Sequence, residues 1–204
     1  MLKNDNEKMM VAEKDIGLER LLNKHDSLIT VAGSLDEFYA LEETKADFVN
    51  GYIHIQMGAS VTHERIFVEL ITQLNVFVKK DQLGKVFGSR LSVGISSNYH
   101  PEPDIFFVGK DNRGKYANDR FNGTPDLVIE IISPSTRKLD LEEKRPLYQN
   151  SLVPEIYFID FDNKVVIIDL LEDGKYISFT LHIGTFASRV LTGLEWEVEK
   201  MYLP

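Results

Sequence analysis

The sequence predicts an α/β or α+β fold with one mixed β-sheet flanked by helices. Two apolar runs, at 105–108 and 127–132, lie between turn signals and predict strands buried on both faces. Apolar residues at helical spacing in 63–80 predict a helix that packs against such a sheet. The order helix, strands, helix, strands along the chain favours a sheet layered with helices.

Composition sets the limits for the function. The chain has 204 residues, 43% hydrophobic and 27% charged, which is enough for one domain with a substantial core. Its net charge of -9 gives no general attraction to nucleic acid, so such a contact needs a local basic patch. The absence of cysteine excludes disulfides and thiolate sites and is typical of a reducing cytoplasm. With neither a signal peptide nor a membrane-spanning run, we expect a cytoplasmic protein without membrane contact.

The first 33 residues predict an appendage, possibly helical, that precedes a single domain at 34–204. A helix over 7–24 would carry only a thin apolar stripe, so a frayed or partner-dependent segment is the alternative. The appendage and the exposed sheet edges both predict association, and a symmetric homodimer is the commonest form that association takes.

The elements of the domain follow in order from local signals. Ser34 and Glu37 form a capping box that predicts a short helix through about Glu43. The dipeptide Asn50-Gly51 predicts a hairpin between two short strands. Thr62 is the expected cap of the helix at 63–80, and the stretch 86–95 predicts a strand before the loop that leads to Asp104.

The second half predicts a helix and then three strands. The helix is expected to be capped near Asp140, with a kink or a delayed start at Pro146 because proline lacks a backbone donor. The three strands are expected at 155–160, 164–171 and 175–181, with turns between them, and the C-terminal segment is expected to cover one edge of the sheet.

Acidic residues stand inside or beside the apolar strands. Asp104 opens one strand and Glu130 interrupts the other. A buried carboxylate is costly unless it is paired, hydrogen-bonded or bound to a metal. Residues two and four apart in a strand share a face, so Asp126 and Glu130 point the same way, and Asp104 joins them if the strands are neighbours. Repulsion among these carboxylates would be relieved by a divalent cation such as Mg2+, which prefers oxygen ligands.

A series of motifs carries a family resemblance. NGYIHIQM, His63 at a helix start, PDI, GTPDLVIEIISPSTR, a D-x-x-x-K-x-x-x-Y pattern and PEIYFID follow one another. In this order the chain resembles the "putative restriction endonuclease" family of the PD-(D/E)xK nuclease superfamily, over about residues 34–204. The resemblance implies a restriction-endonuclease-like central mixed sheet with helices on both sides. It also implies an endonuclease that hydrolyses phosphodiester bonds of DNA with Mg2+ or Mn2+.

The resemblance also implies roles for particular residues. Asp104 and Glu130 match the two metal-binding acids, and Asp47 takes the place of a glutamate as a third catalytic, metal-binding acid. The superfamily lysine usually stands two residues after the second acid, where this chain has Ile132. Lys144 on the following helix is therefore expected as the catalytic lysine, which orients water or stabilises the transition-state charge.

Four further residues are expected around the metal ligands or against the substrate: His63, Asp126, Asp140 and Tyr148. Each also has an ordinary structural explanation. His63 could pack at a helix start, Asp126 could bond a turn, and Tyr148 could fill the core. Lys144, four residues after Asp140, could form a surface ion pair of a few tenths of a kcal/mol.

Two basic groups are candidates for a phosphate-binding rim, although solvated loop charge is the alternative for each member. They are Lys79, Lys80, Lys85 and Arg90, and Lys110, Arg113, Lys115 and Arg120.

Three functions therefore stay open at this point. The first is a metal-dependent nuclease acting on DNA, or less favourably RNA. The second is a catalytically degenerate nuclease scaffold that binds a nucleic-acid or protein partner. The third is a hydrolase that uses paired carboxylates on another substrate, such as a glycoside.

Overall fold

The computed structural model describes residues 27–41, 44–88 and 90–203. The helix expected over 7–24 lies outside these ranges. Residues Ser27–Ala32, which were expected to belong to the appendage, form strand β1 and pair antiparallel with β3 (Tyr52–Met57). The segment SLITVA is rich in β-branched residues, which is the signal for a strand that the sequence interpretation missed.

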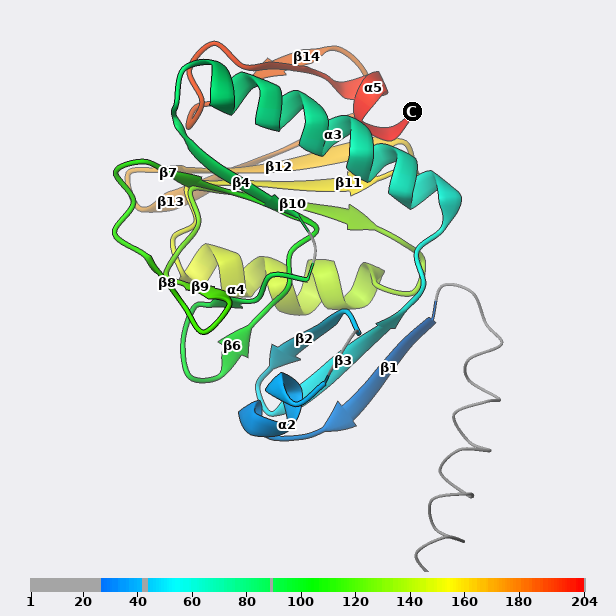
Figure 1. The fold of residues 1–204 in the computed structure, drawn as a ribbon. Helices are drawn as coiled ribbons and strands as arrows, with labels where there is room; N and C mark the ends of the chain where they lie inside the picture. The colour runs from blue at the N-terminus through cyan, green and yellow to red at the C-terminus, as the bar shows by residue number, and fades with distance from the viewer. Residues whose placement is uncertain (1–26, 42–43, 89, 204) are drawn as a thin grey trace, which may run out of the picture.

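A six-stranded mixed sheet forms the centre of the fold (Figure 1). β10 and β11 run parallel, whereas the other neighbouring strands of this sheet run antiparallel. The strands in spatial order are β13 (Lys175–Leu181), β12 (Val165–Glu172), β11 (Glu155–Asp160), β10 (Leu127–Ile132), β7 (Ile105–Gly109) and β4 (Gly84–Gly88). The predicted central mixed sheet is confirmed, and so are the three strands expected after residue 154.

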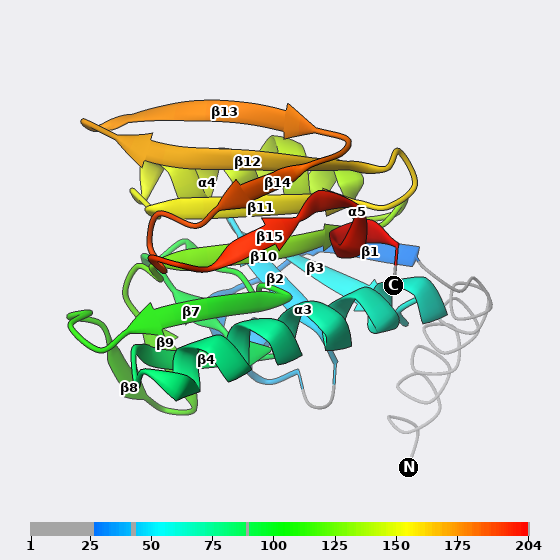
Figure 2. The same ribbon diagram turned by 90° about the horizontal axis from the view of Figure 1, so that it is seen from above.

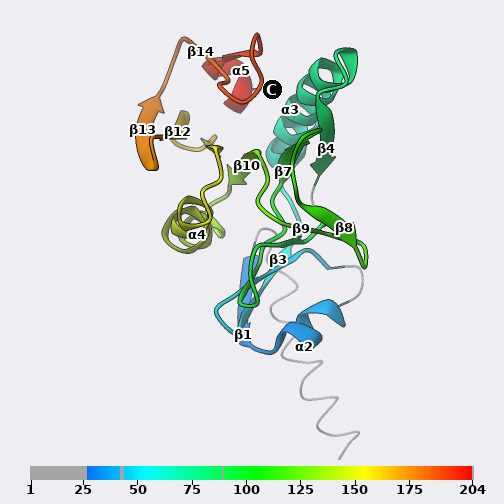
Figure 3. The same ribbon diagram turned by 90° about the vertical axis from the view of Figure 1, so that its left-hand side faces the viewer.

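Both faces of this sheet are covered, as the apolar runs predicted. Leu127, Ile129 and Ile131 of β10 pack with α3 (Val61–Lys80) and α5 (Val198–Tyr202) on one face. Val128 and Ile132 pack on the other face with residues of α4 (Arg145–Asn150). Figures 2 and 3 show the sheet between these layers, with α3 and α5 on one side and α4 on the other. Glu130 therefore points toward the face that carries α4.

A smaller antiparallel sheet lies beside the face that α4 covers (Figure 1). Its strands in spatial order are β1, β3, β2 (Ala46–Val49) and β6 (Tyr99–His100). The predicted hairpin is confirmed, because Asn50 and Gly51 join β2 to β3 with φ of 50° and 81°, as a type I′ turn requires. The capping box of Ser34 is also present, but its helix α2 (Leu35–Tyr39) is shorter than expected.

The long helix α3 begins two residues before its expected start. Ser60, not Thr62, is its cap, and the Ser60 hydroxyl accepts a hydrogen bond of 3.1 Å from the backbone N–H of His63. Both residues are good capping types, and the chain already turns helical at Val61. Of the expected apolar stripe, Ile66, Leu70 and Leu74 are fully buried. The stripe also includes the buried Val78, which was not expected. Its other expected members are partly buried: Phe67, Ile71 and Phe77.

The second helical region contains an irregularity at the expected place. Leu139–Lys144 form a π-helical segment, in which the N–H of Arg145 donates to the carbonyl of Asp140, and α4 follows. Pro146 stands in the first turn of α4, where a missing backbone donor costs nothing. The expected delayed start is wrong, because helical structure already begins at residue 137, and the irregularity takes the form of this π-helical segment just before Pro146. Asp140 is not the cap, because it lies inside that segment.

Three smaller features differ from expectation. The stretch 86–95 is divided between β4 and the short strand β5 (Val93–Gly94), which belong to different sheets. An unexpected hairpin of β8 (Lys115–Ala117) and β9 (Arg120–Asn122) pairs with β5. The C-terminal strands β14 (Thr185–Ala187) and β15 (Glu195–Glu197) cover a face of the large sheet instead of an edge, because Trp196 packs into its core.

No helix in the described part of the chain is both long and apolar enough to cross a membrane.

Candidate active site

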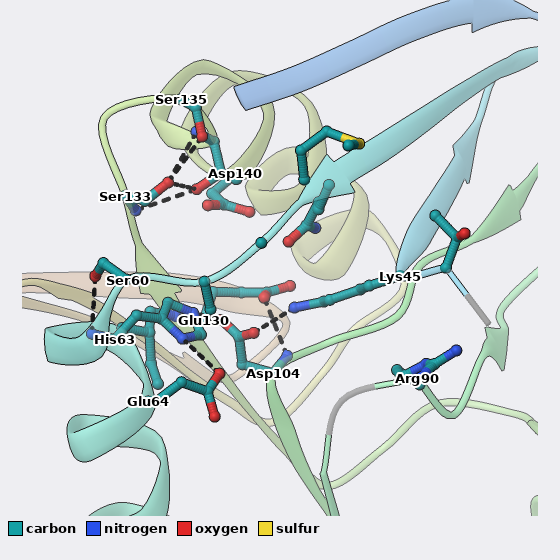
Figure 4. Close-up of a pocket in the computed structure, with 17 residues that line it drawn as sticks. Lys45, Ser60, His63, Glu64, Arg90, Asp104, Glu130, Ser133, Ser135 and Asp140 are labelled. Atoms are coloured by element: carbon teal, nitrogen blue, oxygen red, sulfur yellow. Dashed lines mark hydrogen bonds and ion pairs between the residues drawn. The ribbon is translucent and has the colours of Figure 1, made fainter. Parts of the chain in front are cut away.

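A cavity of about 400 Å³ opens where the large sheet meets the first turn of α3 (Figure 4). The end of β10, the start of β7, the end of β3 and the loop after β10 all contribute to its wall. Its charged or ionisable lining residues are Lys45, His63, Glu64, Arg90, Asp104, Glu130 and Asp140. Four acids around one hollow make it the natural candidate for the site that the sequence predicts.

Asp104 and Glu130 are held beside each other by the pairing of β7 with β10. The backbone N–H of Asp104 donates to Glu130 Oε2 at 3.3 Å, and the N–H of Ile131 donates to Asp104 Oδ2 at 2.8 Å. The two residues are 3% and 1% exposed, and both line the cavity. The structure therefore brings together the two acids that the sequence singled out.

Cationic groups approach Asp104 from two sides. The ammonium of Lys45 forms an ion pair with Asp104 Oδ1, and His63 Nε2 lies 3.4 Å from Asp104 Oδ2 (Figure 4). Burial opposes ionisation of Asp104, but Lys45 and His63 outweigh it and hold the pKa of this carboxyl below its ordinary value. In return, and against the effect of burial, Asp104 raises the pKa of His63. His63 thus touches a predicted metal ligand while it starts α3.

Glu130 has a different environment. Its Oε1 accepts a hydrogen bond of 2.6 Å from the Tyr148 hydroxyl and lies 2.7 Å from Lys144 Nζ. Burial raises the pKa of Glu130 to about 7, opposed by Lys144 and reinforced by the neighbouring acids Asp140 and Asp104. Tyr148 is fully buried, so it both fills the core and contacts the site.

Lys144 lies beneath the cavity and is absent from its lining. Its side chain is 0% exposed, and its Nζ lies 2.7 Å from Glu130, 3.3 Å from Asp47 and 3.3 Å from Asp140. Although burial lowers the pKa of Lys144, Asp47 and Glu130 raise it well above its ordinary value. The ion pair expected between Asp140 and Lys144 is present, but it is buried and not on the surface. It belongs to a cluster in which Asp47, Glu130 and Asp140 surround one ammonium.

Asp47 does not reach the cavity, contrary to the role that the resemblance implied. Its Oδ1 accepts a hydrogen bond of 2.8 Å from the N–H of Glu102 and lies near Lys144, and its Oδ2 accepts one of 2.9 Å from Gln56 Nε2. The short aspartate side chain on β2 is thus fully engaged by these three partners. Its placement makes it a partner of Lys144.

Asp126 is not brought to the site either. It precedes β10, at the end of the strand opposite to Glu130, and its Oδ2 accepts hydrogen bonds from the Gly109 N–H at 2.7 Å and from Asn112 Nδ2 at 2.8 Å. The turn explanation for Asp126 is therefore the one that the contacts support.

The basic groups do not form one rim. Arg90 lines the cavity. Lys85 lies 5.0 Å from the centre of the Tyr116 ring, and Arg120 stacks 3.5 Å from the centre of the Tyr39 ring. Of the residues placed by these contacts, Arg90 is the one that lines the cavity.

Sequence interpretation missed four residues of this region. Lys45 stands two residues before Asp47, and Glu102 stands between two prolines just before Asp104. Glu102 is buried, its pKa is raised to about 7 by burial and by Asp47, and it accepts a hydrogen bond from the Ala46 N–H at 3.2 Å. Ser133 and Thr136 bond one another in the loop after β10. Ser133 and Thr136 could have been found from the sequence, because they are polar residues in the loop that directly follows the buried strand β10.

The oxygen ligands that the cavity offers to Mg2+ are the carboxylates in its wall. Among the described residues, no three side chains of His, Asp or Glu form a group that could hold a metal ion by itself. Two carboxylates, Asp104 and Glu130, are nevertheless side by side in the cavity wall. Mg2+ is commonly held by one or two carboxylates, with water and substrate phosphate completing its octahedral shell. The residues present therefore fit a Mg2+ site that a substrate completes.

Comparison with known proteins gives a family and a fold. Residues 35–199 match the model of the Uma2 family, described as "Putative restriction endonuclease". The fold is similar to the crystal structure of a "putative nuclease belonging to DUF820" from Anabaena variabilis, with a TM-score of 0.69 and 19% identity over 83% of this chain and 97% of that chain. The chain matches no curated protein. The fold is thus restriction-endonuclease-like, with mixed sheets and few helices.

Proposed function

Because this chain belongs to the Uma2 family of restriction-endonuclease-like proteins, we propose that it is a metal-dependent endonuclease that hydrolyses phosphodiester bonds of DNA. The observation that carries the proposal is the juxtaposition of Asp104 and Glu130 in one cavity wall, held by a bond from the Asp104 N–H to Glu130 and one from the Ile131 N–H to Asp104. Mg2+ or Mn2+ is the proposed cofactor. We also propose a cytoplasmic location and a homodimer.

In this proposal Asp104 and Glu130 hold the metal ion. When bound, the ion would supply Lewis acidity toward the phosphate and a water of lowered pKa. Glu130, whose pKa is raised to about 7, is the acid whose ionised form gains most from a nearby cation. Asp104 is already ionised beside Lys45 and His63. The pair thus joins one acid whose pKa is lowered by its cationic neighbours to one whose pKa is raised by burial.

The surrounding residues orient these two acids. Tyr148 and Lys144 fix Glu130 Oε1, and Lys144 in turn is held by Asp47 and Asp140. Such pre-organisation keeps the metal ligands in one geometry without cost at the moment of reaction.

A second candidate function is a degenerate nuclease scaffold that binds a nucleic-acid or protein partner. It is favoured by the internal charge pairing, since Lys45 neutralises Asp104 and Lys144 neutralises Glu130 without any metal. The third hypothesis, a glycoside hydrolase, gains no support from the family to which the chain belongs.

The test is cleavage of supercoiled plasmid, single-stranded DNA and RNA by the purified full chain. We expect products with Mg2+ or Mn2+ and none with a chelator. Asp104→Asn should remove the activity, whereas Asp126→Asn, which changes an acid at the other end of the β7–β10 strand pair, should keep it. A parent that cleaves none of the three substrates with either metal would favour the scaffold.

A further inference from the structure

Two lysines flank the acid pair, and their exposure to the cavity differs. Lys144 is 0% exposed and does not line the cavity. The side chain of Lys45 is 17% exposed and lines the cavity together with Asp104 and Glu130. Figure 4 shows Lys45 reaching toward Asp104 from the side opposite to His63. A group that acts on a substrate must reach the space that the substrate occupies, so this difference bears on which lysine takes part in the reaction.

The partners of Lys144 keep its ammonium away from the cavity. Three buried carboxylates, those of Glu130, Asp47 and Asp140, lie within 3.3 Å of its Nζ. Among the described residues Lys144 Nζ makes no hydrogen bond of good geometry, so these three acids hold the ammonium by their negative charge. Movement of Lys144 toward a phosphate would leave buried acids without their counter-charge, which is strongly unfavourable.

The backbone of Lys45 is held by the small sheet, and its ammonium is ion-paired with Asp104. Its carbonyl accepts a hydrogen bond of 2.9 Å from the Gln56 N–H, and Ala46 next to it is bonded to Glu102, which fixes the start of β2. Among the described residues, the ion pair of Lys45 is with Asp104. Its position in the cavity wall is therefore set by the sheet, while its ammonium depends on one carboxylate.

We infer that Lys45, and not Lys144, is the catalytic lysine, and that its ammonium contacts the scissile phosphate. This inference rests on the proposed nuclease function. While no cation is bound, Lys45 serves as the counter-charge of Asp104. If a divalent cation were held by Asp104, the Lys45 ammonium would lose that partner and could bind a phosphate oxygen, where negative charge grows during hydrolysis. Lys144 acts as a positioning residue that orients Glu130 from below.

The experiment compares Lys45→Met, Lys45→Arg and Lys175→Met in the full chain. Lys175 is an exposed lysine at the start of β13 and controls for the loss of one positive charge. Plasmid cleavage is measured under single-turnover conditions at saturating Mg2+, and Mn2+ affinity is measured by calorimetry without substrate. Melting curves establish that each variant is folded.

We expect Lys45→Met to cleave at least about 10²-fold more slowly than the parent, as is typical when a group that stabilises transition-state charge is removed. Its Mn2+ affinity should be equal or higher, because no ammonium competes for Asp104. Lys45→Arg should recover part of the rate, and Lys175→Met should match the parent.

The outcomes separate this inference from the proposed function. An active parent with an equally active Lys45→Met variant overturns the assignment of Lys45 and leaves the nuclease proposal intact. Weaker Mn2+ binding by Lys45→Met would show that Lys45 organises the metal site instead of contacting phosphate, and would also overturn the assignment. A parent that binds Mn2+ but cleaves no nucleic acid overturns the nuclease proposal and the catalytic role of Lys45 together.

Discussion

The hydroxyl of Tyr148 donates a hydrogen bond of 2.6 Å to Oε1 of Glu130, and both side chains are buried. Tyr148 lies on α4, four residues after Lys144, so the same helical face supplies two contacts to one carboxylate oxygen. This bond connects the core of the protein to its candidate metal ligand, and it can be removed without removing any charge.

Tyr148→Phe should lower the free energy of unfolding by about 1–2 kcal/mol, because a buried acceptor loses its donor. It should also weaken metal binding, since Glu130 loses part of its orientation. Urea unfolding and Mn2+ calorimetry measure the two effects. Tyr157→Phe is the matched control, because it removes a buried 2.6 Å bond to Glu155 away from the cavity. Equal metal affinities for the two variants would contradict the role of Tyr148.

Glu130→Gln should abolish the stabilisation that metal confers. Millimolar Mg2+ or Mn2+ should raise the melting temperature of the parent, because binding adds about 2.7 kcal/mol to the free energy of unfolding when the metal is at 100 times its Kd. The amide variant should remain folded, show no metal-dependent shift and cleave no substrate. Differential scanning calorimetry with and without chelator provides the measurement. If the melting temperature of the parent is the same with and without Mg2+ or Mn2+, this site does not bind a metal ion.

Lys144→Met should destabilise the fold by about 3–5 kcal/mol, because three buried acids would lose their common cation. Lys200→Met is the comparison, since its ion pair with Glu197 has the same 2.7 Å separation as that of Lys144 with Glu130 but is exposed. That substitution should leave the stability close to that of the parent, because an exposed ion pair contributes little. Denaturant unfolding at neutral pH measures both. If the two variants are equally stable, the buried cluster does not have the structural role assigned to it.

Glu102→Gln should become more stable than the parent as the pH rises. The pKa of Glu102 is raised by burial from 4.5 to about 7, so the folded state holds a proton that the unfolded state has released. The parent therefore loses stability between about pH 4.5 and 7, and the amide avoids this contribution. The gap should reach up to about 3 kcal/mol near pH 8, at about 1.4 kcal/mol per pKa unit. Unfolding curves from pH 5 to 8 measure it, and a gap independent of pH would refute the ionisation of Glu102.

The homodimer can be tested at the outer strand of the large sheet. β13 is an edge strand on which Ile177 and Phe179 are 40% and 43% exposed, and exposed apolar edges favour association. We expect light scattering to give a dimer for the full chain and a monomer for Phe179→Lys. A version lacking residues 1–26 tests the N-terminal contribution without removing β1. A monomeric full chain would refute the proposed homodimer.

The sequence predicted those parts of the fold that depend on local signals. Asn50-Gly51 specifies its turn through positive φ angles, and the apolar pattern of 127–132 specifies a strand buried on both faces. It also identified Asp104 and Glu130, because ionisable residues beside or within apolar strands need a special environment.

The other site residues depend on contacts between distant segments. Nothing local indicates that Asp47 bonds to Lys144 or that Lys45 enters the cavity, because both facts follow from how the small sheet docks on the large one. The wrong cap of α3 has a simpler cause, since Ser60 and Thr62 are equally suitable by type.

The position of Lys144 also bears on the order in which the protein folds. Asp47 is made early in the chain, Glu130 much later, and the lysine that neutralises both comes later still. Before residues 139–144 pack in place, burial of Asp47 in the small sheet or of Glu130 in the large sheet would cost free energy, because neither carboxylate has its counter-charge. Both carboxylates must therefore stay hydrated until then. The two sheets are therefore expected to close on each other in one late, cooperative step, which requires contacts between residues far apart in the sequence and makes folding slow relative to a helical protein of similar size.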